Sequence, residues 1–467
     1  MIDFVGPSYV LANRKASIQR TINLFVSKTE ATDKAPFILQ SVPGLVLRAT
    51  LAGEFRGSLE TNSRAFAVYG STLYEVFADY STVSRGTLST TTGAVSIAYG
   101  LFQLVIVDGS NGYVLSFSSN TFAKITAPAF TGADTVGFID NFFIFSKDRK
   151  GEQYQLSAIN DATIINGLDF SSAESSPDDL VSHLVIQAGA LLYGTLTMEL
   201  HVNTGSNDFP LERSRGSGFQ VGLMARESLK LADNTAYWIG RDKNGSGIVY
   251  RLVGGQAQRI STQAVEQALQ ASTNLALARA WVYQKNGLTF YAVNAPGLTT
   301  TPVYEASTGT WCDRCDLDSF GQYMAGRVTG SLFAFDKHFA CADGFLYEWS
   351  DSTYTNDGSV LVRERTSPHE AVPGRFRQFF ESFWLDATTG GAGSGISPIV
   401  ELSYSNDSGK TWSNAITRSL GAIGEIFARL YWTRLGSGQD RVWKVKCSAN
   451  APFSIISAGS NSKVGTT

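Results

Sequence analysis

Seven short strand segments, most of them aromatic, recur along this chain with the spacing of one propeller blade. They are residues 73–76, 113–117, 154–156, 198–202, 249–253, 303–306 and 346–349. Their spacing of roughly 40–50 residues, with β-forming residues in each segment, is typical of β-propellers. A propeller is a rigid disc of radially arranged sheets around a central channel. We therefore expect an all-β chain with six or seven blades, six if one segment is a terminal strand that closes the ring.

Hairpin signals between the segments place the propeller at residues 45–360, behind an N-terminal arm at 1–44. A second β-domain, a small β-sandwich, is predicted at 361–467, with strands near 376–385, 398–405, 428–435 and 442–447. Residues 363–368 are interpreted as a linker or crossing strand, and residues 460–467 as a loose tail. A capped helical run at 261–269 is expected to pack on a blade edge.

The composition favours a polar, uncharged surface. Only 17% of the 467 residues are charged, so Ser, Thr, Asn and Gly must cover much of the exterior, as in many assembly components. The formal net charge of −3 gives no general attraction to nucleic acid. The local basic groups are expected to be solvated or to lie in interfaces. They are Arg14, Lys15, Arg20, Arg363, Arg365, Arg375 and Arg377.

The cysteines and histidines suggest no metal site and no catalytic site. Four cysteines are too few for a disulfide scaffold at this length. Cys312 and Cys315 have zinc-ligand spacing, but no second pair supports them, and we interpret them as ordinary strand or turn residues, as we do Cys341 and Cys447. Neither metal nor cofactor is predicted. The chain has four histidines, and none of them has the spacing of a catalytic or metal-binding motif. They are His183, His201, His338 and His369.

The N-terminal residues do not have the pattern of a signal peptide, and no apolar run is long enough for a membrane-spanning helix. We therefore expect synthesis in a cytoplasm. This disfavours a secreted or periplasmic propeller scaffold, one of two alternative interpretations of the chain.

One turn motif stands out in the predicted sandwich. Residues 405–412 fit the Asp-box pattern of sialidases, in which Ser405 and Asp407 brace a turn, Gly409 supplies a positive φ and Trp412 packs beneath. Such a turn is structural and not catalytic. It motivates the second alternative, a glycan-binding or glycan-cleaving propeller, for which no convincing carboxylate pair is found. We predict no enzyme activity.

Several ordered stretches resemble one family, the tail-hub or nozzle proteins of short-tailed bacteriophages, which are packaged-DNA stabilization proteins. Together they span most of residues 18–458. The stretches include Ser41-Val42-Pro43-Gly44-Leu45, Ala236-Tyr237-Trp238-Ile239, Ile248-Val249-Tyr250-Arg251, Gln258-Arg259-Ile260-Ser261-Thr262, Val303-Tyr304-Glu305-Ala306-Ser307, Trp311-Cys312, Glu401-Leu402-Ser403-Tyr404-Ser405-Asn406-Asp407 and Arg441-Val442-Trp443-Lys444-Val445.

The resemblance implies a structural protein of the virion tail. Members of the family form a ring, typically a homohexamer, below the portal and its adaptor protein. The ring retains packaged genomic DNA, conducts it during ejection without sequence-specific binding, and anchors tail spikes, fibres or a needle. A mildly acidic chain suits such a conduit, because each neutralised phosphate would add affinity that resists ejection. We also expect the 361–467 domain to dock toward the adaptor.

Overall fold

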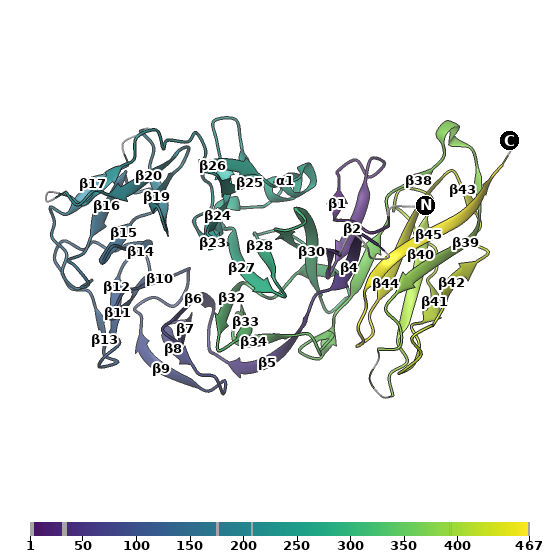
Figure 1. Ribbon diagram of the computed structural model, residues 1–467, viewed down its shortest axis with the longest axis horizontal. Coiled ribbons are helices and arrows are strands. Elements are labelled where there is room, and N and C mark those ends of the chain that lie inside the picture. Colours follow the sequence, from purple (N-terminus) through teal and green to yellow (C-terminus); the bar gives the residue numbers. More distant parts are fainter. Residues whose placement is uncertain are drawn as a thin grey trace.

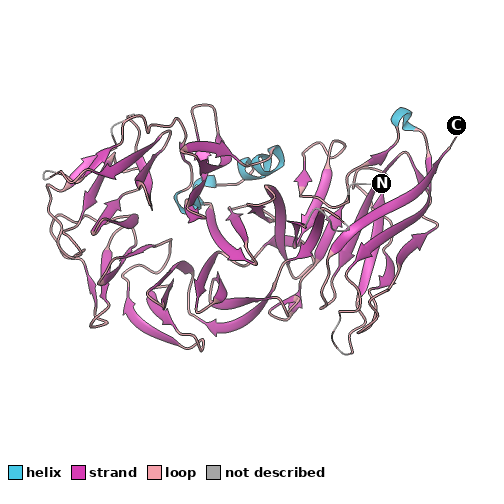
Figure 2. Ribbon diagram, viewed as in Figure 1, coloured by secondary structure: helices cyan, strands magenta, loops and turns pink. Residues whose placement is uncertain are grey.

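The computed structural model describes residues 4–29, 35–173, 177–206, 209–391, 393 and 395–465, except for the side chain of Arg375. A propeller and a sandwich lie side by side along the long axis of the molecule (Figure 1). Nearly all regular structure is strand (Figure 2). The helices are α1 (Gln263–Gln270) and the short 3-10 turns η1 (Arg226–Ser228), η2 (Leu275–Leu277) and η3 (Pro373–Arg375).

The described residues of the propeller form seven blades. In the first four blades, consecutive strands are antiparallel neighbours, and the first strand of each blade lines the central cavity. The first four blades are β6–β9 (Phe55–Thr61, Arg64–Tyr69, Thr72–Val76, Thr82–Thr87), β10–β13 (Ser96–Tyr99, Gln103–Val107, Gly112–Ser116, Phe122–Lys124), β14–β17 (Thr135–Ile139, Phe142–Ser146, Gln153–Leu156, Phe170–Ser172) and β18–β21 (Leu180–Ile186, Gly189–Gly194, Met198–Asn203, Leu211–Arg213).

The last three blades carry additions to this pattern. They are β22–β26 (Gly222–Leu223, Lys230–Ala232, Thr235–Arg241, Ser246–Val253, Gln256–Arg259), β27–β31 (Arg279–Lys285, Leu288–Asn294, Thr301–Glu305, Thr310–Leu317, Tyr323–Ala325) and β32–β34 (Gly330–Ala334, Lys337–Ala342, Phe345–Ser350) with β5 (Gly44–Thr50), β35 (Thr355–Asn356) and β36 (Ser359–Val360).

All seven recurring segments of the sequence coincide with the third strand of a blade. These strands are β8, β12, β16, β20, β25, β29 and β34. The six-blade alternative is therefore wrong, because the segment at 346–349 belongs to an interior strand of blade seven. The strand that closes the ring comes instead from the N-terminal side: β5 pairs antiparallel with β34, placing Leu45 opposite Trp349. The first and last parts of the propeller are thus joined in one sheet.

The sandwich consists of two sheets that enclose one aromatic core. One sheet contains β3 (Leu24–Lys28), β4 (Phe37–Ser41), β45 (Ile455–Val464), β39 (Gln378–Ala387), β42 (Leu430–Thr433) and β43 (Ser437–Gly438). The other contains β37 (Arg363–Thr366), β44 (Asp440–Cys447), β40 (Ile399–Ser405), β41 (Ile416–Ser419) and β38 (Glu370–Ala371). Fully buried Trp432 and Trp443 pack around Phe383 between the sheets.

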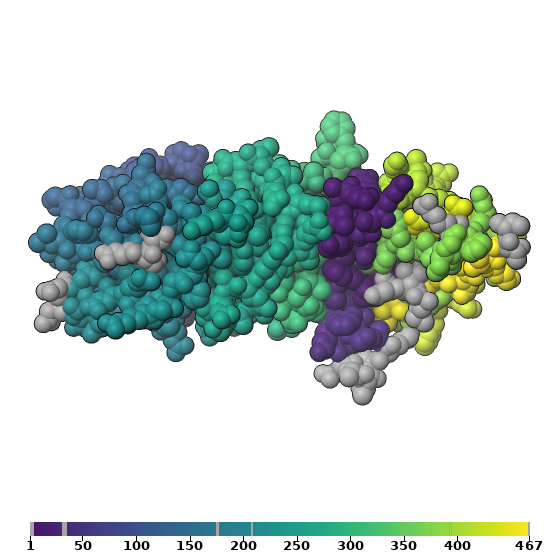
Figure 3. All heavy atoms as spheres, turned by 90° about the horizontal axis from the view of Figure 1, so that it is seen from above, coloured from purple at the N-terminus to yellow at the C-terminus, as the bar shows by residue number. Residues whose placement is uncertain are grey.

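The N-terminal segment connects the two domains instead of projecting as an arm. After β1 (Tyr9–Val10), strand β2 (Ile18–Ile22) lies between β30 of blade six and β37 of the sandwich, so that blade and sandwich share one sheet. The buried amide of Asn23 donates to the carbonyls of Cys315 and Val362, at 2.9 and 2.8 Å. Figure 3 shows the purple N-terminal residues between the two domains. The exact domain boundaries remain a prediction.

The structure decides several finer predictions. Residues 363–366 are a crossing strand and not a linker, and α1 packs on blade five with Thr262 as its N-cap. The prediction of a loose tail at 460–467 is wrong up to Val464, because β45 pairs along most of β39 through main-chain hydrogen bonds. Residues 466–467 lie outside the described part.

The prediction for the local basic groups is also partly wrong. Arg363 and Arg365 have no exposed surface, whereas Arg14, Lys15 and Arg377 are exposed as expected. Arg363 donates to the carbonyls of Ala449 and Ala451. Strand β37 lies in the middle of the shared sheet, and segments outside its strands cover the two arginines; Arg365 likewise donates to the carbonyls of Phe4 and Pro7.

Candidate functional site

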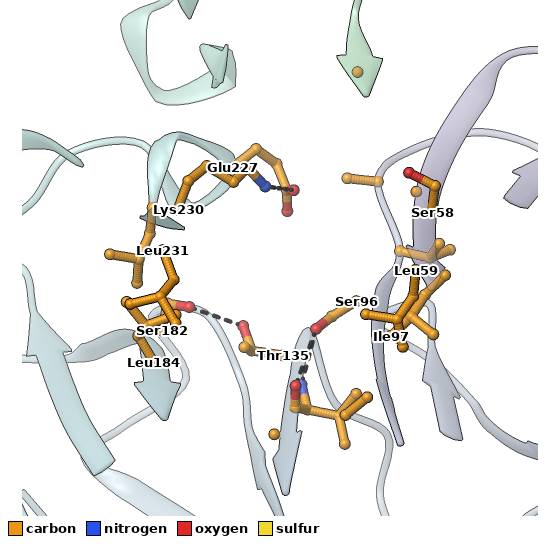
Figure 4. A pocket seen from close by; sticks show the side chains of 18 of the residues that line it. Ser58, Leu59, Ser96, Ile97, Thr135, Ser182, Leu184, Glu227, Lys230 and Leu231 are labelled. Atoms are coloured by element: carbon orange, nitrogen blue, oxygen red, sulfur yellow. Dashed lines mark hydrogen bonds and ion pairs between the residues drawn. The ribbon is translucent and has the colours of Figure 1, made fainter. Parts of the chain in front are cut away.

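The central channel of the propeller is a cavity of about 900 Å³ lined by all seven blades. The lining comes from the innermost strands β6, β10, β14, β18, β27 and β32 and, in blade five, from η1 and β23 (Figure 4). Its volume falls within the range of small-molecule pockets, about 300–1,000 Å³. The cavity of a single propeller therefore does not offer the continuous wide passage that duplex DNA needs.

The hydroxyl groups on this lining bind neighbouring blades instead of pointing freely into the cavity. Each bond joins the innermost strands of two adjacent blades, as Figure 4 shows for two pairs. The bonds are Ser58 Oγ to the Ser331 carbonyl (3.0 Å), Ser331 Oγ to the Val282 carbonyl (2.6 Å), Ser96 Oγ to the Val136 carbonyl (3.3 Å) and Thr135 Oγ1 with Ser182 Oγ (3.0 Å). They hold the blades together around the channel.

Charged side chains at one end of the cavity also form pairs. Arg226 contacts Asp134 at 2.7 Å and Glu227 at 2.9 Å, and Arg279 contacts Glu54 at 2.6 Å. The Arg226–Asp134 pair connects blade five to blade three, and the Arg279–Glu54 pair connects blade six to the start of blade one. The cavity thus has the features of a rigid structural hub, with its charges and most of its hydroxyls used to hold blades together.

His183 lines this cavity and is buried in the neutral state. Its Nδ1 lies 2.8 Å from Ser146 Oγ, and burial lowers the pKa of its imidazole to about 3. An unfolded chain binds the proton near pH 6.5. The unfolded state therefore binds more protons than the folded state between about pH 3 and 6.5, and stability must fall as the pH is lowered through this window.

We expect His183→Gln to weaken this acid sensitivity. Gln can still hydrogen-bond Ser146 but cannot take up the proton, so its unfolding midpoint should change less between pH 7 and pH 4 than that of the unmodified chain. Urea unfolding at several pH values measures this difference. Equal pH slopes for the two chains would show that His183 is not buried in the neutral state. His338 provides the comparison: it is partly exposed and burial also lowers its pKa, so His338→Gln should weaken the acid sensitivity by less than His183→Gln.

The four predicted Asp-box residues meet in the turn between β40 and β41, outside the propeller. Asp407 accepts from Thr411 Oγ1 at 2.6 Å and from Thr411 N at 2.9 Å, while Ser405 Oγ accepts from Gly409 N at 2.9 Å. Gly409 has φ +78°, and the half-buried Trp412 ring lies 4.0 Å from Lys444 Nζ. The bonds from Thr411 hold the pKa of Asp407 well below its usual range.

We expect Asp407→Ala to loosen this turn without unfolding the chain. Because the folded pKa of Asp407 is depressed, its contribution is present above its unfolded pKa of about 4 and is lost as the pH falls further. Amide hydrogen exchange at Thr411 should accelerate in the variant at a fixed neutral pH, and the protection of this amide relative to a free peptide at the same pH should fall when the unmodified chain is acidified. Unchanged exchange at Thr411 in the variant would contradict a bracing role.

Two family models match the chain, one in the propeller and one in the sandwich. The model described as "Bacteriophage P22 Gp10, beta-propeller" matches residues 19–313, and "Bacteriophage P22 Gp10, beta-sandwich" matches residues 374–461. The chain belongs to the bacteriophage P22 Gp10 family. It is accordingly a structural protein of the phage tail that stabilises packaged DNA, a virion component that assembles with other virion proteins.

Other comparisons add little to this assignment. No curated protein matches the sequence. Among solved structures, the computationally designed Ika8 protein is 15% identical and matches 71% of this chain and 99% of its own, with a TM-score of 0.40. A chain of the mitotic checkpoint complex is 11% identical, matches 70% of this chain and 98% of its own, and has a TM-score of 0.42. These likenesses carry no functional argument.

One cluster with catalytic residue types, which we did not predict, lies between blades three and four of this Gp10-family chain. His201 Nε2 lies 2.7 Å from Glu199, and its Nδ1 lies 2.9 Å from the Tyr154 hydroxyl. The i, i+2 spacing of Glu199 and His201 on one strand was the only sequence signal. All three residues are buried, with at most 2% of each exposed, so a substrate cannot reach them. The cluster therefore ties two blades together.

The cysteine pair is similarly enclosed. Cys312 and Cys315 lie in β30, where burial raises the pKa of Cys312 to about 12 and also raises that of Cys315. Within the described ranges, no three or more Cys, His, Asp or Glu groups form a metal-binding arrangement. The described helices are also too short or too polar to cross a membrane.

Proposed function

We propose that the chain is a subunit of the tail hub or nozzle, assembling as a ring of six copies that extends the portal and adaptor channel. The ring retains packaged DNA, conducts it during ejection and anchors spikes, fibres or a needle. The observation that supports this best is the closed propeller hub. The blades meet around a cavity of only about 900 Å³, which is too small for duplex DNA. In this proposal the DNA therefore passes through the centre of the ring of subunits, and each propeller forms part of the wall of that channel.

A rigid connection between the domains suits such a wall. The shared sheet runs from β27 of blade six through β2 and β37 to β41 of the sandwich, so a force on either domain is carried by paired strands. A flexible linker would instead let the two domains turn independently. The pressure of packaged DNA favours the continuous arrangement.

The charge balance suits a passage through which DNA slides. With a net charge of −3, the chain has no overall excess of basic groups to release counterions from DNA. We expect weak DNA binding that disappears at moderate salt and shows no sequence preference. Tight, salt-resistant binding would contradict a conduit role.

The direct test uses DNA-filled heads that carry the portal and adaptor but lack this protein. Adding the purified chain should place a ring on each head, visible by electron microscopy, and should protect the packaged DNA from added nuclease. A stable monomer that never joins these heads would overturn the proposal. Heads without the adaptor are the control, and we expect no ring on them.

Docking of the sandwich toward the adaptor is part of this proposal. Deleting residues 361–467 is a poor test, because it removes β37 and β44 from the sheet that holds β2. A surface variant is sharper: Phe379 and Val464 are about half-exposed at one end of the sandwich. Phe379→Ser with Val464→Ser should reduce attachment to heads. Full attachment would place the adaptor contact elsewhere.

A further inference from the structure

One apolar surface lies on blades two and three, far from the sandwich. We call it the blade patch; its members are Leu101, Phe102, Ile159, Ile164 and Leu168. Their side chains are 58–79% exposed, which is unusual for a group of five large apolar residues. In Figure 1, blades two and three occupy the end of the long axis opposite β41 and β42.

The two segments that carry the blade patch are held together by hydrogen bonds. Gln103, next to the β10–β11 turn, donates to Asp161 at 3.1 Å and accepts from the Ala162 amide at 2.9 Å. Ala162 is fully buried in the core between blades two and three. The loop at 157–169 is therefore anchored by its interior residues, while its neighbours Ile159 and Ile164 remain exposed.

The charged groups in these segments all have one sign. Residues 99–102, 140–141 and 157–169 contain three charged side chains, those of Asp140, Asp161 and Asp169. Asp140 is exposed, and Asp161 and Asp169 are partly exposed. The blade patch is therefore apolar and acidic.

A second apolar surface lies at the opposite end of the molecule, on the loop between β41 and β42. We call it the tip patch; Ile423, Ile426 and Phe427 are 67%, 62% and 92% exposed. The loop is held in place, because Thr389 Oγ1 donates to the Ile426 carbonyl at 2.7 Å and the Gly424 amide donates to the Gly390 carbonyl at 3.0 Å.

Arginines border the tip patch. Arg418 and Arg429 lie on or beside β41 and β42, and the guanidinium of Arg429 is 5.4 Å from the centre of the Tyr431 ring. The one acidic group of the loop, Glu425, is exposed and accepts the Ala422 amide at 2.8 Å, so two arginines against one carboxylate leave a net positive charge around the patch. The tip patch is therefore apolar with a basic border.

We propose that the tip patch of one copy packs on the blade patch of the next copy in the ring. This inference rests on the proposed ring. A closed ring of identical chains needs two different, complementary surfaces on each copy. The two patches are both apolar, carry opposite charge and lie at opposite ends of a rigid molecule. Pairing either patch with itself would instead bring like charges together.

Crosslinking on assembled heads tests the contact directly. All four native thiols are buried, so cysteines placed by Phe427→Cys and Leu168→Cys are the accessible ones. With a bifunctional thiol reagent, the double variant should give a ladder of covalent oligomers that ends at the ring number. Each single variant should give only monomers, because residue 427 of one copy faces residue 168 of the next copy, and each single variant has a cysteine at only one of these two positions.

Removing the apolar groups provides an independent measurement. Ile423→Ser with Phe427→Ser, and separately Leu101→Ser with Phe102→Ser, should each reduce ring formation at least tenfold while leaving the unfolding midpoint unchanged. The matched control is Phe320→Ser, at an 86% exposed aromatic residue outside both patches. We expect the control to form rings normally.

The outcomes separate this inference from the function beneath it. Rings that form on heads without a crosslinked ladder, or that tolerate both patch variants, would overturn the contact and leave the hub function intact. If the patch variants form normal rings but these rings fail to join other tail proteins, the patches bind those proteins instead. That result would also overturn the proposed contact between neighbouring copies. Absence of any ring from the unmodified chain would instead refute the proposed function.

Discussion

Replacing Arg365 with leucine is expected to lower the free energy of unfolding by about 3–5 kcal/mol, because several buried acceptors lose their donor and each costs about 1–3 kcal/mol when left unpaired. Arg365 is fully buried in β37, at the junction of the two domains. Its guanidinium donates to the carbonyls of Phe4 (2.7 Å) and Pro7 (2.8 Å). It also donates to Thr21 Oγ1 at 2.9 Å and to the Gln19 side chain at 3.0 Å.

The cost arises because leucine leaves these acceptors buried without their donor. Equilibrium unfolding in urea measures the change, with Arg377→Leu as the control, since Arg377 is exposed and donates to Ser437. The control should change the unfolding free energy by no more than about 0.5 kcal/mol. Lysine at 365 should be intermediate, because it supplies a charge but not the planar fork of donors. Equal stability of the leucine and control variants would contradict the structural role of Arg365.

The sequence predicts the propeller well because every blade repeats the same local signal. The third strand of a blade lies between two neighbouring strands and needs β-branched and aromatic residues, as Val249 and Tyr250 illustrate in β25. That requirement recurs seven times, so periodicity alone reveals the fold. The Asp-box turn was also visible, because all its groups lie within eight residues.

The connections between distant segments could not be predicted in this way. Strand β45 is rich in Ser, Gly and Asn, and it is held by main-chain pairing with β39, a strand about 75 residues away. The charged run at 363–365 has the composition of an exposed segment. Its burial depends on β2 and β44, which come from opposite ends of the chain. Hydrophobic patterning contains no information about such partners.

The central hub and the two surface patches were missed for the same reason. In the sequence, Ser58, Ser96 and Ser182 are ordinary strand residues. Their hydroxyls form hydrogen bonds between blades only because the blades are arranged in a circle. The exposed Phe427 lies in a short loop that has no repeating pattern. Function in this chain therefore depends on long-range geometry more than on any motif.

Closure of the propeller by β5 leads to the second large effect. Gly44 begins β5, and its amide donates to the Thr353 carbonyl at 2.9 Å. A Cβ atom at this position would lie 2.3 Å from the Thr353 oxygen and 2.6 Å from the Thr355 oxygen. Both neighbours are backbone atoms and cannot rotate away. We expect Gly44→Ala to lower the unfolding free energy by about 3 kcal/mol, as severe overpacking does.

The effect of Gly44→Ala should be concentrated where the ring closes. Hydrogen exchange should accelerate in β5 and β34, which pair across this closure, more than in blades three and four. Gly245→Ala is the matched control, because a Cβ at that position meets nothing within 4 Å and the backbone is not left-handed. A uniform increase in exchange across all blades would contradict local opening at the closure. It would instead indicate that the seven blades unfold as one cooperative unit whose stability depends on β5.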